Sequence, residues 1–223
     1  MTDDRRINTY LGSLSSGNGS FLDELERTAV LEGVPIIRPT VRSLLKVIIS
    51  GSRPKDILEV GTAVGYSAIL MAGCMPKGST ITTIEKYDKR IPAAKENFKK
   101  SGYDGCITLL EGEAADILKE LAGKGRKFGL IFMDAAKGQY LNFFDDVMTL
   151  LLPGGILVSD NVMQDGDVLM SRYAVARRDR TIHSRMREYL YVLTHDERLS
   201  TVILPVDDGV SVSVKQYETD KET

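Results

Sequence analysis

The spacing of apolar residues predicts helices in the first part of the chain. Apolar side chains that recur every three or four residues form one face of a helix. The Gly-Asn-Gly-Ser stretch at 17–20 separates the first predicted helix from the second, and Ser20 is placed to cap the second. Pro35 disfavours helix in the residue before it, so we expect residues 34–37 to be extended and a third helix to cover Thr40–Ile49. The apolar positions of the first two helices are Ile7, Tyr10, Leu11 and Leu14, then Leu22, Leu25 and Ala29.

From Asp56 onward, short apolar runs alternate with segments of helical spacing. Short apolar runs are typical of buried strands, and helices between them are the connections that parallel strands need. The pattern therefore predicts an α/β fold with a doubly wound, mostly parallel sheet that is buried on both faces. The runs are Ile57–Val60, Thr80–Glu85, Ile107–Leu110, Leu130–Met133, Ile156–Ser159, Thr201–Val206 and Val210–Lys215.

The last two runs are separated only by Asp207, Asp208 and Gly209. A gap this short cannot hold a crossover helix, so the pair must form an antiparallel hairpin. Parallel strands followed by this hairpin give a Rossmann-like, seven-stranded mixed sheet, preceded by N-terminal helices. A dinucleotide dehydrogenase does not ordinarily end in this way.

Composition narrows the class of protein. The chain has 223 residues and a formal net charge of −2, so nucleic-acid binding would need a local basic patch. Cys74 and Cys106 lie in apolar stretches with no Cys/His cluster, which predicts free thiols in a reducing compartment. The N-terminus has no apolar signal core, and no run approaches the ~20 apolar residues of a membrane span. We expect a cytoplasmic protein with no membrane partner.

The first predicted strand leads into a glycine turn with the sequence EVGTAVGYS, residues 59–67. A strand, a glycine turn and a helix start form the nucleotide-binding corner of an open α/β sheet. Glycine lets the backbone approach a ligand closely. The spacing Gly61-x-x-x-Gly65 differs from the Gly-x-Gly-x-x-Gly of a pyrophosphate binder. A nucleoside cofactor without pyrophosphate, such as S-adenosylmethionine, suits this turn.

Two acidic positions follow at the same edge of the predicted sheet. Glu85 ends the second strand, roughly 20 residues after the glycine turn, where a carboxylate accepts hydrogen bonds from both ribose hydroxyls. The alternative is a solvated carboxylate at a strand end. Glu113 and Ala114 follow the third strand and are placed to meet an adenine ring, although Glu113 could equally be only a helix cap.

Hard oxygen ligands follow the next two strands. Asp134 ends the fourth strand, and Asp160 and Asn161 end the fifth. Because adjacent parallel strands converge at their carboxyl ends, these side chains are expected in one crevice. Carboxylate and amide oxygens suit Mg²⁺. Lys137 lies three residues after Asp134, and a lysine near a cation in a sheltered cleft can act as a base, whereas most lysines are solvated surface residues.

At these residues the chain resembles the cation-dependent O-methyltransferases, which include the catechol and caffeoyl-coenzyme A O-methyltransferases. The resemblance covers about Val34 to Lys215 and is carried by ILEVGTAVGYSA, Glu85, EGEA, IFMDAAKGQY, LLLPGGILVSDNV and LPVDDGVSVSVK. It implies a homodimeric enzyme that uses S-adenosylmethionine and a divalent cation, Mg²⁺ above all, to methylate a hydroxyl. We accordingly predict a single methyltransferase domain at 1–223, with an N-terminal helical cap (1–52) and a cofactor-binding core (53–217).

The resemblance also implies roles for individual residues. Asp134, Asp160 and Asn161 correspond to metal ligands, and Lys137, with Asp134, to the catalytic residues. Two departures are visible. Asp207 stands where the family often has Gly, and Arg187-Glu188-Tyr189 stands where plant-type members have a Phe-Asn pair facing the acceptor, which argues against a plant-type phenolic substrate. The predicted cofactor contacts are Ile37, Glu59, Gly61, Tyr66, Ser67, Glu85, Glu113, Ala114, Asp134 and Tyr140.

More narrowly, the run DAAKGQYLNFF resembles the bacterial enzymes that methylate 5-hydroxyuridine at the tRNA wobble position. The segment Arg172–Glu188, which we predict to be helical, carries six arginines against Asp179 and Glu188, and six minus two gives a local charge of +4. Such a segment could hold phosphates, although arginines on a helix also form salt bridges, face water or meet a dimer partner. The candidate RNA contacts are Arg172, Arg177, Arg178, Arg180 and Arg185.

Three hypotheses remain at this point. The leading one is methylation of tRNA, and the second is methylation of a small phenolic acceptor with catechol-like vicinal hydroxyls. Both acceptors present two adjacent oxygens that can chelate one Mg²⁺, which lowers the pKa of the hydroxyl before Lys137 takes its proton. The third is a cofactor-binding module without catalysis, which would lack the metal ligands or the base. The amphipathic first helix must cover its own sheet, the active site or a twin subunit.

Overall fold

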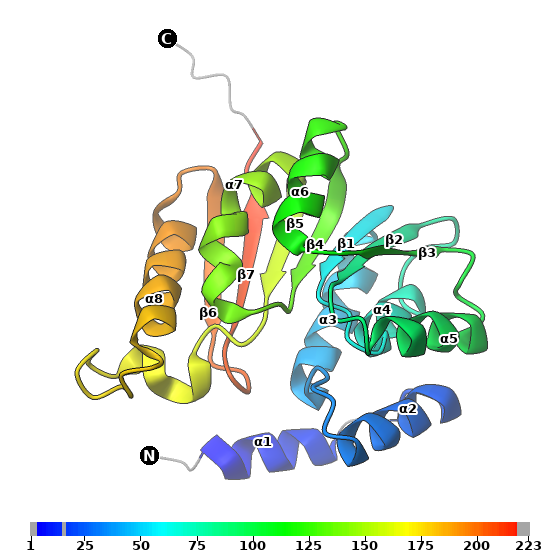
Figure 1. Cartoon of the computed structure of the whole chain (residues 1–223), viewed down its shortest axis with the longest axis horizontal. Coiled ribbons are helices and arrows are strands. Elements are labelled where there is room, and N and C mark those ends of the chain that lie inside the picture. The colour runs from blue at the N-terminus through cyan, green and yellow to red at the C-terminus, as the bar shows by residue number, and fades with distance from the viewer. Residues whose placement is uncertain (1–3, 15–16, 218–223) are drawn as a thin grey trace. The chain divides into compact units, whose positions relative to one another are not determined.

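The computed structural model describes residues 4–14 and 17–217. The chain divides into two compact units, Met1–Ile117 and Leu118–Thr223 (Figure 1). This division differs from the predicted one into a cap (1–52) and a core (53–217), which stays a prediction together with the single domain. Each unit is described by itself below.

Three helices open the first unit: α1 (Asp4–Ser13), α2 (Ser20–Leu31) and α3 (Pro39–Ser52). They confirm the three predicted helices. The prediction that Ser20 caps α2 is wrong, because the cap position belongs to Gly19 (φ 93°) and no side chain caps this helix. The apolar face of α1 stays open within the described residues, with Tyr10, Leu11 and Leu14 all exposed. The side chain of Ile7 lies outside the described residues.

The strands of the first unit are β1 (Asp56–Val60), β2 (Thr80–Glu85) and β3 (Ile107–Glu111). They pair in parallel in the order β3-β2-β1, so their carboxyl ends meet at one edge. β1 and β2 are buried along almost their whole length, as expected for strands covered on both faces. Helices α4 (Tyr66–Ala72) and α5 (Ile91–Ser101) connect these strands, and α6 (Ala114–Gly123) begins in this unit and ends in the next.

The second unit holds β4 (Phe128–Met133) and β5 (Leu151–Ser159) in parallel, then the antiparallel hairpin β6 (Leu199–Leu204) and β7 (Val210–Lys215). β7 also pairs antiparallel with β5. The helices of this unit are η1 (Lys137–Gln139, a 3-10 turn), α7 (Tyr140–Leu150), η2 (Gln164–Leu169, 3-10) and α8 (Arg180–His195).

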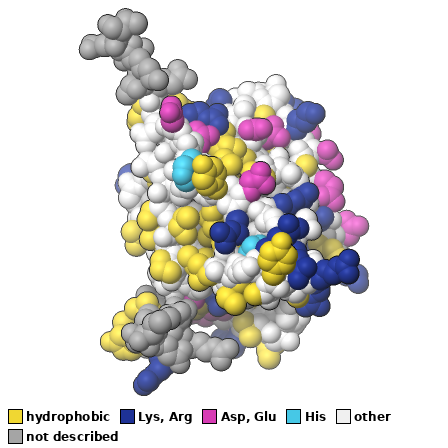
Figure 2. All heavy atoms as spheres, turned by 90° about the vertical axis from the view of Figure 1, so that its left-hand side faces the viewer, with side chains coloured by type: hydrophobic (Ala, Val, Ile, Leu, Met, Phe, Trp, Pro, Cys, Tyr) yellow, Lys and Arg dark blue, Asp and Glu magenta, His cyan; other side chains and the backbone are white. Residues whose placement is uncertain are grey.

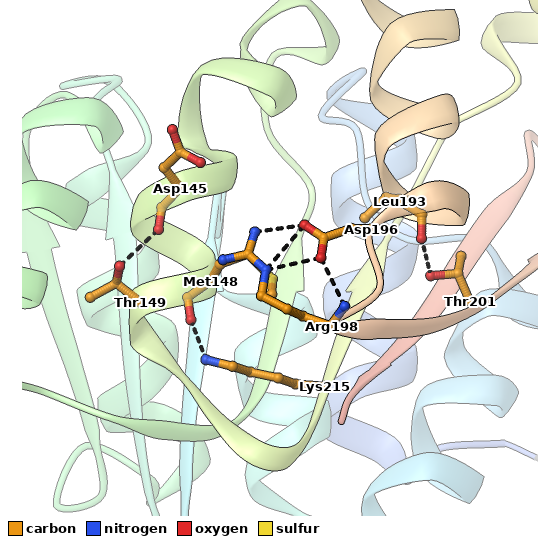
Figure 3. Close-up of polar contacts among 8 residues, drawn as sticks. All are labelled: Asp145, Met148, Thr149, Leu193, Asp196, Arg198, Thr201 and Lys215. Carbon is orange, nitrogen blue, oxygen red and sulfur yellow. Dashed lines mark hydrogen bonds and ion pairs between the residues drawn. The ribbon is translucent and has the colours of Figure 1, made fainter. Parts of the chain in front are cut away.

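Side-chain contacts tie this hairpin to the helices beside it (Figure 3). Lys215 donates to the carbonyls of Met148 (2.6 Å) and Leu151 (3.0 Å), where α7 ends and its last carbonyls lack helical partners. Thr201 donates to the carbonyl of Leu193 at 2.6 Å. The hairpin thereby has a fixed position relative to α7 and α8, and the turn between β6 and β7 is fixed with it.

The strand order of the whole sheet is β3-β2-β1-β4-β5-β7-β6. The predicted fold class, a Rossmann-like seven-stranded mixed sheet that ends in an antiparallel hairpin, is confirmed. No helix within the described part of the chain has the length and apolar character needed to cross a membrane.

The predicted helix over Arg172–Glu188 is wrong in its first half. α8 begins only at Arg180, and the preceding residues form successive tight turns in which Ala174 N–H donates to Ser171 O and Asp179 N–H to Ala176 O. The Arg180 guanidinium donates to the carbonyls of Val175 and Tyr173. A side chain thus satisfies carbonyls that a helix would have satisfied with backbone N–H groups.

Candidate active site

The glycine turn after β1 has an unusual backbone. Gly61 (φ 95°), Ala63 (φ 48°) and Gly65 (φ 88°) all have left-handed or otherwise positive φ angles. At Gly65 a side chain is excluded by packing as well, because an added Cβ would lie 2.6 Å from Cε1 of Phe98 on α5. The turn therefore needs glycine at this position both for its conformation and for the close approach of α5.

Glu85, at the end of β2, is tied to this turn. Its Oε2 accepts the N–H of Ala63 at 2.8 Å, and its Oε1 accepts the N–H groups of Lys86 and Tyr87, both at 2.9 Å. A carboxylate has about four acceptor positions, so one remains after these three bonds. Glu85 is only 8% exposed and its carboxylate has a fixed orientation, so the remaining acceptor position suits one of the two ribose hydroxyls in the predicted role.

Glu59 lies beneath the turn and has no exposed surface. Its carboxylate accepts the hydroxyl of Ser67 and, at 2.5 Å, the hydroxyl of Thr83. Burial raises the pKa of Glu59 above its ordinary value. Glu59 therefore joins β1, β2 and the start of α4, and its predicted contact with a cofactor stays a prediction.

Tyr66 also has its hydroxyl engaged inside the first unit. Arg42 of α3 donates to the phenol oxygen at 2.9 Å, and the phenol donates to Glu26 of α2 at 3.0 Å. Arg42 and Glu26 are themselves paired at 2.6 Å. Burial raises the pKa of Tyr66 to about 12. This network fixes α4 against α2 and α3 through the hydroxyl of Tyr66, and the cofactor contact of Tyr66 stays a prediction.

The other predicted cofactor residues of the first unit differ in exposure. Ile37 is buried in the extended segment before α3, and Gly61 is partly exposed. Glu113 is exposed, its backbone carbonyl accepts the Ile117 N–H at the start of α6, and its carboxylate pairs with Lys86 at 3.3 Å. Glu113 caps α6 with its backbone, and its side chain faces solvent. Both roles considered for Glu113, the adenine contact and the helix cap, therefore stay open.

In the second unit, the ends of β4 and β5 bring the predicted metal ligands together. Asn161 Nδ2 lies 3.3 Å from Asp134 Oδ1, and the Asn161 N–H donates to Asp160 Oδ1 at 2.7 Å. Asn161 has a left-handed backbone (φ 57°), a conformation that asparagine tolerates better than most residues. The strand-end reasoning therefore placed these three residues correctly beside one another.

The carboxylates in this cluster repel one another. Burial above all, together with the charges of Asp134, Asp207 and Asp208, raises the pKa of Asp160 to about 7. A bound cation would relieve this repulsion, and the oxygens of two carboxylates and one amide fit a divalent ion that keeps several water ligands. Among the described residues, no three His, Cys, Asp or Glu side chains are grouped so as to hold a metal ion by themselves.

Lys137 lies on η1 and pairs with Asp208 of the β6–β7 turn, at 2.7 Å between Nζ and Oδ2. That turn is fixed beside the ligand loop, because Val162 N–H donates to Gly209 O and Met163 N–H to Asp208 O. No local pattern marks Asp208 as a partner of Lys137, because the two residues lie 71 positions apart. Asp207, noted above where the family often has Gly, has the left-handed backbone (φ 50°) that explains the usual glycine.

Tyr140 is fully buried at the start of α7, and its hydroxyl contacts the backbone of both ligand loops. The oxygen lies 3.1 Å from Met133 O, 3.1 Å from Asp160 O and 3.3 Å from Ala135 N. Burial raises its pKa well above the ordinary value, so the phenol keeps its proton. The hydroxyl of Tyr140 has these backbone partners, and the predicted cofactor contact of Tyr140 stays a prediction.

The arginines around α8 fall into two groups. Arg180, Arg185 and Arg187 each donate to backbone carbonyls, Arg185 to that of Gly138 beside Lys137. The other three, Arg172, Arg177 and Arg178, precede α8 and are exposed. Figure 2 shows Lys and Arg side chains gathered on one face beside exposed hydrophobic groups. Tyr189 is buried with its hydroxyl 2.7 Å from Ser159 Oγ, so it does not face an acceptor.

Comparison with known proteins agrees with this arrangement. The family model described as O-methyltransferase matches residues 13–216. A catechol O-methyltransferase from Niastella koreensis is 36% identical over 166 residues, which are 73% of this chain and 75% of that protein. A solved structure from Staphylococcus aureus is 30% identical with a TM-score of 0.85, covering 93% of this chain and 98% of that one. An S-adenosylhomocysteine-bound methyltransferase from Podospora anserina is 27% identical with a TM-score of 0.83, covering 97% of both chains. The predicted enzyme class is thereby confirmed: the chain belongs to the O-methyltransferase family.

Proposed function

We propose that this enzyme uses S-adenosylmethionine and a divalent cation to methylate a hydroxyl that has a second oxygen beside it. The observation that carries the proposal is the cluster at the ends of β4 and β5, where Asp134, Asp160 and Asn161 lie together beside Lys137. Hard oxygens next to a lysine are the groups needed to hold a chelating acceptor and to remove its proton.

The first unit supplies the groups that suit the cofactor. The positive φ angles of Gly61 and Gly65 leave the backbone of the turn open to a ligand, and the Glu85 carboxylate is held in place by three N–H groups. S-adenosylmethionine supplies a methyl group on a positively charged sulfur. The solved Podospora anserina relative carries S-adenosylhomocysteine, the product of that cofactor, which supports the assignment.

The second unit supplies the groups that suit the acceptor. Asp134, Asp160 and Asn161 would hold a divalent cation, whose chemistry is to lower the pKa of a bound hydroxyl. Lys137 would take the hydroxyl proton as a neutral amine, after its ammonium group has lost a proton to solvent. Its ion pair with Asp208 holds Nζ in position, and the partial exposure of the Lys137 side chain lets a proton leave to solvent. Arg185 holds the carbonyl of Gly138, which fixes the loop that carries Lys137.

For the acceptor we propose the 5-hydroxyuridine of a tRNA wobble position. Arg172, Arg177 and Arg178 are exposed on the second unit, and their charge suits phosphates. Tyr173 lies beside them and is 85% exposed, which gives this surface an aromatic ring that a base could stack on. Arg180 and Arg185 are bound to backbone carbonyls, so their part in RNA binding is expected to be small.

A catechol-like small molecule is the second candidate. It is favoured by one observation, the 36% identity to the catechol O-methyltransferase of Niastella koreensis. Both candidates use the same cation, base and cofactor residues, so the cluster of oxygens does not distinguish them.

The test is methyl transfer from labelled S-adenosylmethionine, with Mg²⁺ or with EDTA, to tRNA that carries 5-hydroxyuridine and to free catechol. Label in the tRNA that EDTA abolishes supports the full proposal, and label in catechol alone moves the acceptor to the second candidate. Transfer that survives EDTA contradicts the role of the cation. No transfer to either acceptor by a protein that binds the cofactor contradicts both acceptors.

The arginines are tested by their salt dependence. Replacing Arg172, Arg177 and Arg178 by Ala should lower the slope of log Kd against log salt for tRNA by about 2, since each phosphate contact contributes roughly 0.7 on a single strand. Methylation of catechol should not change. The matched control removes the same charge from exposed lysines elsewhere, Lys77, Lys99 and Lys119. Equal slopes for the two triple variants would contradict the proposed RNA surface.

A further inference from the structure

The hydroxyl of Tyr140 occupies a position from which it can fix both loops that carry the proposed metal ligands. Met133 and Ala135 flank Asp134, and the hydroxyl lies 3.1 Å from Met133 O and 3.3 Å from Ala135 N. It also lies 3.1 Å from the carbonyl of Asp160 itself. The Tyr140 hydroxyl oxygen thus contacts the backbone on both sides of Asp134 and also the backbone of Asp160.

These contacts lie in an environment that makes them strong. Tyr140 has no exposed surface, and in a buried site a hydrogen bond has no water to compete with it. Its ring packs edge-to-face on Tyr189, with ring centroids 5.5 Å apart. The hydroxyl therefore has a fixed position, in which it accepts from the Ala135 N–H and its one proton is shared between the carbonyls of Met133 and Asp160.

The two loops that Tyr140 contacts carry the carboxylates of Asp134 and Asp160, which repel each other. Both carboxylates lie at neighbouring strand ends, so their electrostatic repulsion favours a larger separation of the two loops. The backbone N–H of Asp160, which donates to Met133 O at 2.9 Å, links the two strand ends directly. Tyr140 adds a second link on the same carbonyl, from a rigid helix.

We propose that Tyr140 is a positioning residue that sets the separation of Asp134 and Asp160 for cation binding, through hydrogen bonds to their backbones. The proposal rests on the cation role assigned above. It is a separate role from the predicted cofactor contact of Tyr140, because the hydroxyl would act through the backbone of the ligand loops. Residues that orient metal ligands in this way typically change metal affinity or activity 10–100-fold when they are altered.

The variant is Tyr140→Phe, which removes only the hydroxyl and keeps the ring packing. Tyr189→Phe is its matched control. Tyr189 is equally buried, lies one ring away and loses a hydroxyl of the same kind, but its oxygen bonds the side chain of Ser159, 2.7 Å away, and no ligand-loop backbone. A general loss of core stability would affect both variants, and a loss specific to the ligand loops would affect only the first.

The measurement is Mn²⁺ affinity of the full chain, followed by the electron paramagnetic resonance signal of free Mn²⁺, with S-adenosylhomocysteine at saturation. The bound nucleoside favours the folded state by mass action, so a modest loss of stability does not mask the result. We expect Tyr140→Phe to bind Mn²⁺ about 10- to 100-fold more weakly, with nucleoside affinity unchanged. Tyr189→Phe should bind Mn²⁺ like the wild type.

Each outcome decides the proposal. Weaker Mn²⁺ binding in Tyr140→Phe alone supports it. Wild-type affinity in Tyr140→Phe, or an equal loss in both variants, overturns it. If the wild-type protein binds no Mn²⁺, the cation role fails and the positioning role fails with it, a result that is distinguishable because it appears before any substitution is made.

Discussion

Asp208 is the residue whose alteration best separates catalysis from stability in this enzyme. Its carboxylate is 4% exposed and lies 2.7 Å from Lys137 Nζ, whose side chain is 29% exposed. A hydrogen bond to a charged group contributes about 1.5–3 kcal/mol, and the partial exposure of Lys137 places this one near the lower end. Loss of a bond worth about 1.5 kcal/mol would lower the fraction of molecules with a correctly oriented Lys137 Nζ by roughly a factor of ten.

We therefore expect Asp208→Asn to lower kcat roughly tenfold while leaving the KM for S-adenosylmethionine unchanged. Asparagine keeps the size of the side chain and one acceptor oxygen, so the β6–β7 turn should keep its shape. The assay is steady-state methyl transfer to the acceptor identified above, with the melting temperature measured in parallel to show that the variant is folded.

Asp207→Asn is the control for charge. Asp207 lies on the same turn and also raises the pKa of Asp160, so its replacement removes the same charge near the ligand cluster. Its Oδ2 has no hydrogen-bond partner within the described residues, and asparagine accepts its left-handed backbone well. If Asp207→Asn and Asp208→Asn lower kcat equally, the loss comes from the negative charge that each variant removes near the ligand cluster. That result would refute the positioning of Lys137 by Asp208.

Three further predictions follow from the rest of the structure. Burial raises the folded-state pKa of Glu59 above its ordinary 4.5, so its contribution to stability falls as the pH rises above that value. Urea unfolding from pH 4 to 8 should therefore show the wild type losing stability relative to Glu59→Gln. A difference in stability that stays constant over this pH range would contradict the prediction. Gly65→Ala should cost about 2–4 kcal/mol by urea unfolding, because the new Cβ meets Phe98, whereas Gly78→Ala (φ 82°, open space) should cost only about 1 kcal/mol for backbone strain. We propose that α1 contacts a second copy of the chain, so sedimentation equilibrium should give a dimer for the wild type and a monomer for Leu11→Glu; a monomeric wild type would refute the homodimer.

The strands were predictable because each signal is local. Every run from Ile57 to Lys215 matches a strand, although Thr201–Val206 extends two residues past the end of β6 and Leu151–Gly155 extends β5 ahead of its predicted start. Residue spacing alone determines which face a strand side chain takes, and a turn of three residues permits only a hairpin. Asp134, Asp160 and Asn161 were predictable for the same reason, since topology alone brings the ends of neighbouring parallel strands together.

Partners that are distant along the chain were not predictable. Asp208 meets Lys137 across 71 positions, and Tyr66 bonds Glu26 across 40. No local pattern marks either contact, because each depends on how a helix or a hairpin packs after folding. Tyr66 and Tyr140 are predicted cofactor contacts on the family resemblance, and the bonds that their buried phenols make to other parts of their own unit had no signal in the sequence.

The arginines of the second unit show how a charge count can mislead about function. The sum of +4 over residues 172–188 treats every guanidinium as available, but a guanidinium that bonds a carbonyl has part of its donor set in use and its position fixed. Arg185 on Gly138 and Arg187 on Val168 therefore shape the loops around the candidate site and present little free charge. The three exposed arginines before α8 are the part of the segment that a phosphate can reach, and they lie on turns, which can adjust to a bound strand more easily than a helix can. Specificity for an RNA acceptor would then reside in the residues before α8, and activity on any chelating acceptor in the residues at the ends of β4 and β5.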